Sequence, residues 1–150
     1  MTTAILRPVR LLGYGGLIPF AAAAAAALLG PTPWRGMALS ALAAYGAVIL
    51  SFLGAVHWGL ALHAPPQEAP AAWPRLGLGV LPALVGWIGL LLPPPFGLAL
   101  LATGLLAVAA TETVDARRQL LPPGYLPLRW MLSLGAAACL LSGTLTTTAS

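Results

Sequence analysis

Long apolar runs separated by short breaks dominate the pattern of this chain. Counting the polar flanks that a membrane crossing would draw in, the runs cover residues 11–29, 37–62, 76–92, 96–115 and 128–147. A helix needs about 20 residues to cross roughly 30 Å of hydrocarbon. Backbone polar groups find no water in lipid, and the alternation typical of strands is missing from the sequence, so helices are the expected spanning structure. The pattern predicts an all-α integral membrane bundle of five transmembrane helices.

The breaks between the runs are rich in proline and glycine. They are GPTPWRG at 30–36, APPQEAPAAWPR at 64–75, PPP at 93–95 and a longer segment at 111–127. Proline at the start of a helix, or just past its end, removes no hydrogen bond that the helix needs. We therefore expect turns between neighbouring helices, and a single domain over residues 1–150.

Composition agrees with a membrane environment. The chain is 59% hydrophobic and 7% charged, whereas an average soluble domain is about 25% charged. So few ions cannot cover a water-exposed surface. The bilayer is expected to act as solvent for most of the protein, which makes lipid its first partner.

The arginines are distributed unevenly between the two ends of the predicted bundle. Lysine is absent, and six of the seven arginines fall at one end: Arg7, Arg10, Arg75, Arg117, Arg118 and Arg129. Arg35 falls at the other end. The positive-inside rule then predicts a cytoplasmic N-terminus and a C-terminus outside. The pI near 10.3 reflects this topology and contact with anionic lipid, so no nucleic-acid partner is expected.

The first run also has the pattern of a signal peptide, because two arginines precede it and alanines occupy 21–27. Its apolar core is long for a signal peptide. We expect it to remain as the first span.

Signatures of catalysis and metal binding are missing from the sequence. Cys139 is the only cysteine, so no intramolecular disulfide can form. The two histidines and three acids show no zinc-ligand spacing, no HExxH, no glycine-rich phosphate loop and no haem-attachment motif. We therefore expect no enzyme activity, no metal and no cofactor.

His57, in the stretch SFLGAVHWG of the second run, leads the polar residues that remain. Ionisable groups at membrane depth are costly and are functional candidates by default. The fourth run, Phe96 to Ala110, would span only about 22 Å, so that helix must draw in Glu112 and Asp115. These acids share one helical face and are the expected partners of His57, with Arg75, Arg117, Arg118 and Arg129 as counterions.

Other interpretations of His57 stay open. Pro19 and Pro82 each release the carbonyl four residues earlier, at Gly15 and Leu78, and a neutral imidazole could donate to one of them. This structural role is the first expectation, and proton transfer or ligand binding is the second. A haem-ligand role comes last, because His63 lies six residues on and points to a different face. For the acids, the simplest expectation is an interfacial ion pair with arginine.

Small residues recur at every fourth position of the second run, namely Ala43, Ala47, Ser51, Ala55 and Gly59, and Gly46 and Gly54 lie near the His57 face. Small residues let helices approach closely, so we expect a central helix with neighbours on both sides. A third face could meet lipid or a partner protein, and it carries Tyr45, Ile49, Phe52 and Val56.

Several segments resemble the DUF3429 family over most of the chain. They are LGYGGLIPF (12–20), YGAVILSFLGAVHWG (45–59), Asp115 and GYLPLR (124–129). The resemblance implies a small multi-pass protein of bacterial or mitochondrial inner membranes, and we expect the bacterial inner membrane. It implies no reaction, substrate or cofactor. The residues it points to are Tyr14, Pro19, Ser51, His57, Trp58, Asp115 and Arg129.

Two function classes follow. The preferred one is a non-enzymatic accessory, scaffold or assembly component of a membrane complex, bound to another membrane protein or to a second copy of itself. The alternative is a carrier or binding protein for protons, quinone or another small amphiphile, with a cytoplasmic-side cluster around His57. An intramembrane hydrolase ranks third, because no serine or acid pair has a recognisable partner. The candidate binding residues are His57, Glu112, Asp115, Arg75, Arg129, Ser51, Trp58 and Tyr14.

Overall fold

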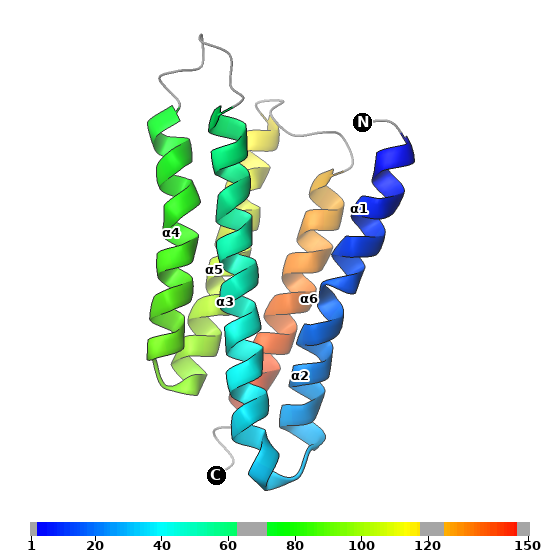
Figure 1. Ribbon diagram of the computed structural model, residues 1–150, viewed down its shortest axis with the longest axis vertical. Coiled ribbons are helices and arrows are strands. Elements are labelled where there is room, and N and C mark those ends of the chain that lie inside the picture. Colours follow the sequence, from blue (N-terminus) through cyan, green and yellow to red (C-terminus); the bar gives the residue numbers. More distant parts are fainter. Residues whose placement is uncertain (1–2, 63–71, 118–124, 147–150) are drawn as a thin grey trace.

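The computed structural model describes residues 3–62, 72–117 and 125–146, and these residues contain six helices. The helices are α1 (Thr3–Gly15), α2 (Leu17–Leu29), α3 (Thr32–Leu62), α4 (Ala72–Leu91), α5 (Pro94–Arg117) and α6 (Tyr125–Leu145). α1 and α2 follow one another as a single bent rod, so the bundle has five rods, and α1 begins at the opposite end from where α6 finishes (Figure 1).

Among the described residues, five helical stretches are long and apolar enough to cross a membrane: Arg7–Leu29, Thr32–Gly59, Trp73–Leu91, Pro94–Val114 and Tyr125–Leu145. The predicted all-α class is therefore confirmed, with five helices of the length and composition that a span requires. The fourth of these helices is longer than its apolar run, as predicted, because α5 continues past Ala110 to Arg117 and is 24 residues long. At 1.5 Å per residue that is about 36 Å, enough to cross.

The first span departs from prediction, because it is broken at Gly16 where a continuous helix was expected. The Gly16 N–H donates to the carbonyls of Leu12 (2.9 Å) and Gly13 (3.1 Å), and the next helix begins at Leu17. Adjacent glycines followed by a proline are a recognised cause of helix bending. Here Gly15, Gly16 and Pro19 supply that cause, and the Tyr45 hydroxyl donates to the Gly16 carbonyl at 3.1 Å.

α3 lies at the centre of the bundle and packs against α2, α4, α5 and α6. Its small residues act as predicted. A Cβ on Gly54 would collide with the Gly79 carbonyl, and one on Gly86 would lie 3.2 Å from the Ala47 carbonyl. Larger side chains at these glycines would therefore force α3 and α4 apart.

The core is built from large side chains of four spans, all less than 2% exposed: Phe20, Leu42, Leu50, Leu98, Leu101, Leu105 and Leu140. The bulky third face predicted for α3 is only partly outward. Tyr45 packs edge-on against Phe20, with ring centroids 4.8 Å apart, whereas Phe52 is 65% exposed. Tyr45 turns inward because its hydroxyl can reach the Gly16 carbonyl.

Candidate functional site

Three ionisable side chains that are buried among the described residues, His57, Glu112 and Arg129, lie toward one end of the bundle. His57 and Glu112 each lie five residues before the end of their helix, and Arg129 lies four residues after the start of α6. At 1.5 Å per residue, all three are within about 8 Å of those ends. The end concerned is where α3 and α5 finish and α1 and α6 begin (Figure 1). His57 and Glu112 therefore lie at a similar depth in the bundle, as predicted, and Arg129 lies at about that depth too.

Glu112 and Arg129 form a buried ion pair between α5 and α6. Arg129 Nε donates to Glu112 Oε2 at 2.8 Å, and the two side chains are 5% and 3% exposed. Arg129 Nη1 also donates to Ser133 Oγ at 2.5 Å, and the indole N–H of Trp130 donates to Thr113 Oγ1 at 2.9 Å. The ion pair expected between an acid and an arginine is present, and it joins the two helices.

Two polar atoms of the pair remain without a partner among the described residues. Arg129 Nη2 and Glu112 Oε1 are both buried and make no hydrogen bond there. A buried polar group without a partner costs roughly 1–3 kcal/mol, and more if it is charged. Tyr125, one turn before Arg129 on α6, interacts electrostatically with both charges and forms a hydrogen bond with the Glu112 carboxylate. The site therefore has one donor and one acceptor to spare.

Arg129 forms part of the wall of a cleft of about 430 Å³ between α1, α2, α3, α5 and α6. We call it the Arg129 cleft. Its lining is apolar apart from Arg129, Ser133 and Tyr125, and consists otherwise of Val9, Leu12, Gly13, Gly16, Leu17, Phe20, Ile49, Phe52, Leu53, Leu105, Leu128, Leu132 and Ala136. Leu12 and Phe52 are 78% and 65% exposed, so the cleft opens sideways toward lipid.

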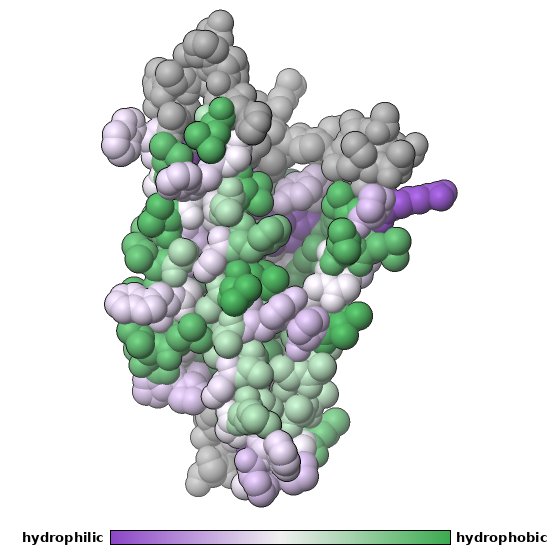
Figure 2. All heavy atoms as spheres, viewed as in Figure 1, coloured by the Kyte–Doolittle hydropathy of each residue, from purple (hydrophilic) through white to green (hydrophobic). Residues whose placement is uncertain are grey.

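The surface view agrees with this description. Figure 2 shows apolar and weakly polar residues over most of this face, as expected for a lipid-facing surface. Strongly hydrophilic atoms are visible in the hollow between α3 and the α1 side of the molecule. Polar atoms below an apolar rim are the usual arrangement of a site for a ligand with a polar head.

His57 is 2% exposed and forms no hydrogen bond or ion pair with Glu112, whose carboxylate pairs with Arg129 instead. Its Nδ1 lies 3.3 Å from the Leu53 carbonyl one turn back in α3. A carbonyl only accepts, so this contact requires the proton on Nδ1. The structural role expected for His57 thus has a different acceptor, because the ring bonds to a carbonyl of its own helix and not to the carbonyl of Gly15 or Leu78.

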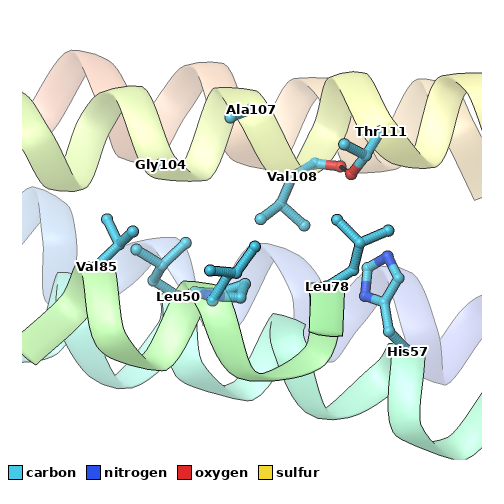
Figure 3. Close-up of a pocket in the computed structure, with 10 residues that line it drawn as sticks. Leu50, His57, Leu78, Val85, Gly104, Ala107, Val108 and Thr111 are labelled. Carbon is cyan, nitrogen blue, oxygen red and sulfur yellow. Dashed lines mark hydrogen bonds between the residues drawn. The ribbon is translucent and has the colours of Figure 1, made fainter. Parts of the chain in front are cut away.

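The imidazole borders a separate cavity of about 160 Å³ between α3, α4 and α5. Figure 3 shows His57 beside Leu78 at one end of this cavity, across from Thr111. The Thr111 hydroxyl donates to the Val108 carbonyl at 2.8 Å. The remaining lining is aliphatic, so little polar chemistry converges on His57.

The other sequence candidates are scattered. Ser51 donates to the Ala47 carbonyl of its own helix at 2.8 Å, and the indole N–H of Trp58 donates to the Leu76 carbonyl at 3.1 Å. The Tyr14 hydroxyl lies 3.9 Å from Met131 sulfur. Arg75 is partly buried in the first turn of α4. The side chain of Asp115 lies outside the described residues.

Sequence reasoning missed Ser133 and Tyr125. Both lie four residues from Arg129 on α6, the spacing at which side chains on a helix become neighbours. If Arg129 had been predicted to be buried, this spacing would have indicated Ser133 and Tyr125 as its neighbours. In the described part of the chain, no three His, Cys, Asp or Glu side chains come close enough to hold a metal ion.

Comparison with known proteins gives a family and one relative. Residues 5–145 match the family described as a protein of unknown function, DUF3429. The chain is also 41% identical over 87 residues to Transmembrane protein 69 of Xenopus tropicalis, and the match covers 57% of this chain and 33% of that protein. The chain thus matches about a third of the length of that curated relative. No solved structure matches it.

Proposed function

Since the chain belongs to the DUF3429 family and is a multi-pass membrane protein, we propose that it is a non-enzymatic binding protein for a lipid-soluble ligand, held in the Arg129 cleft. One observation carries this proposal. A buried arginine with a spare N–H borders an apolar cleft that opens toward lipid. Ionisable residues at membrane depth usually serve binding or transport.

The size of the cleft supports the same conclusion. Ligand sites are commonly about 300–1,000 Å³, mostly apolar, with a few convergent polar groups. The Arg129 cleft, at about 430 Å³, falls in that range, whereas the His57 cavity is about 160 Å³. The proposal therefore keeps the alternative of a small amphiphile but moves its site from His57 to Arg129.

The experiment compares two neighbouring leucines of α1. Leu11 and Leu12 are 74% and 78% exposed, but only Leu12 lines the cleft. Protein purified from its native membrane in mild detergent is extracted, and the released amphiphiles are identified by mass spectrometry. We expect one amphiphile class enriched over bulk lipid in wild type and in Leu11→Trp, and depleted in Leu12→Trp. The proposal is abandoned if extracts of all three proteins match bulk lipid.

A second candidate is the accessory or assembly component of a membrane complex, and the surface of α2 favours it. Its outward side is made of small residues, Ala21, Ala22, Ala25 and Ala26, all exposed. Small residues on a membrane helix permit close packing with another helix. The partner would be another membrane protein or a second copy of the chain. Replacing Ala22 and Ala26 by Leu should then release a stoichiometric partner during purification from native membranes, and repeated isolation of the wild-type chain alone would rule this candidate out.

For topology, we propose a cytoplasmic N-terminus, an external C-terminus and location in a bacterial inner membrane. Arg7, Arg10, Arg75 and Arg129 lie at the same end of the bundle in α1, α4 and α6, and Arg35 lies at the other end. The positive-inside rule puts the arginine-rich end in the cytoplasm. A reporter active only outside the cytoplasm, fused after Ser150, should be active. Activity of the same reporter at the N-terminus would reverse the assignment.

A further inference from the structure

The polar part of the Arg129 cleft has no net charge, because Glu112 neutralises the arginine at 2.8 Å. A phosphate or carboxylate head placed against the guanidinium would also meet the field of the Glu112 carboxylate. Arg7 and Arg10 on α1 are exposed and are not among the lining residues. The charge balance therefore favours a neutral head group over an anionic one.

The spare hydrogen-bonding groups specify the head group further. Arg129 offers Nη2 as a donor without a partner among the described residues, and guanidinium nitrogens never accept. Tyr125 also lines the cleft, but its hydroxyl is engaged with the Glu112 carboxylate, so Arg129 supplies the available donor. A carbonyl oxygen, which only accepts, complements this donor without adding charge.

The walls favour a planar ring. Three aromatic side chains from three helices line the cleft, namely Phe20 of α2, Phe52 of α3 and Tyr125 of α6. Aromatic rings pack well against other flat rings in offset or edge-on contacts. The exposed rim at Leu12 and Phe52 gives an apolar tail a way out into the bilayer.

From these three features, and resting on the proposed ligand cleft, we infer that the occupant is a neutral amphiphile of the quinone type. Its ring carbonyl would accept from Arg129, and its tail would leave between Leu12 and Phe52. Glu112 acts here as a positioning residue, since it fixes the guanidinium and cancels its charge. The inference concerns binding and includes no electron transfer.

The test uses two probes with the same ten-carbon tail, one ending in a substituted benzoquinone and one in a phosphate. Purified protein in nanodiscs of phosphatidylcholine is equilibrated with each probe, and the amount retained per chain is measured after extraction. We expect saturation near one quinone per chain and at least about tenfold weaker retention of the phosphate. Leu12→Trp should weaken quinone retention by about tenfold or more, and Leu11→Trp should leave it within about twofold.

Glu112→Gln separates the charge argument from a merely structural role. It leaves the Arg129 charge uncompensated, so the preference should shift by about tenfold or more toward the phosphate. Simple loss of structure would weaken both probes alike. If Glu112→Gln does not fold, the retention of the two probes by wild type and by Leu12→Trp still decides whether the cleft binds the quinone in preference to the phosphate.

Each failure has its own signature. If wild type retains the phosphate as tightly as the quinone, the head-group inference is overturned while a ligand cleft remains. If it retains the phosphate and Leu12→Trp abolishes this, an anionic lipid is the ligand and the quinone is excluded. If neither probe is retained above the level of protein-free nanodiscs, the proposed function and this inference fall together.

Discussion

The buried ion pair between Glu112 and Arg129 gives the sharpest prediction about stability. Four proteins are compared: wild type, Glu112→Gln, Arg129→Met and the double variant. The pair joins α5 to α6, and its side chains are 3% and 5% exposed. Each single change leaves one buried group without its main partner, whereas the double change removes both charges together.

The geometry sets the magnitude. Two unit charges 2.8 Å apart attract by about 6 kcal/mol at an effective dielectric constant of 20, and burial costs each ion several kcal/mol. The net value of the pair is therefore small, but loss of one partner typically costs about 3–5 kcal/mol. Glu112→Gln should be the more damaging single change, because a carboxylate can be neutralised by a proton and a guanidinium cannot.

The assay is reversible unfolding in mixed detergent micelles, followed by circular dichroism as the fraction of denaturing detergent rises. We expect Glu112→Gln to lower the free energy of unfolding by about 3–5 kcal/mol. The double variant should lose at least about 2 kcal/mol less than the sum of the two single variants. Thr113→Val is the matched control, since it removes one neutral hydrogen bond to Trp130 and should cost about 1 kcal/mol.

Additive losses would contradict a direct interaction between the two side chains. If the double variant loses the sum of the two single losses to within about 0.5 kcal/mol, the two side chains do not interact in the folded protein. A Glu112→Gln loss no larger than that of Thr113→Val would contradict the burial of a charged pair.

Two further predictions concern α3. Gly54→Ala should destabilise the protein by about 1–3 kcal/mol, because the added Cβ would collide with the Gly79 carbonyl. The control is Gly77→Ala, whose added Cβ would have no neighbour within 4 Å, and it should be neutral or slightly stabilising in the same unfolding assay. His57→Leu should change the free energy of unfolding by less than about 1.5 kcal/mol and leave quinone retention unaltered, since His57 lines only the smaller cavity. Loss of quinone retention in His57→Leu would indicate that the ligand binds beside His57 instead.

The sequence predicted the number of spans well, because the requirement for about 20 apolar residues acts on each helix separately. It also predicted that the fourth of these helices would extend past Ala110 to include Glu112 and that α3 would pack closely through small residues. Partners were harder to predict. Whether Glu112 faces His57 or Arg129 depends on the rotation of α5 about its axis, and a helix with small residues on several faces leaves that rotation undetermined. Glu112 and His57 lie at a similar depth, but Glu112 faces Arg129 on α6.

The Arg129 cleft depends on the bend at Gly16, and this link can be tested. The cleft is lined on both sides of the bend, by Leu12 and Gly13 of α1 and by Leu17 and Phe20 of α2, and α1 leans further from α3 than α2 does (Figure 1).

Pro19→Ala restores a backbone N–H that can bond to the Gly15 carbonyl and favours a straight helix, which is worth up to about 3 kcal/mol at a helical proline. The straightened rod should bring α1 toward α3 and narrow the cleft, so stability should rise or hold while quinone retention falls by about tenfold. Pro8→Ala is the control, because Pro8 lies in α1 but not in the cleft lining. Equal retention by both variants would show that the cleft does not depend on the bend.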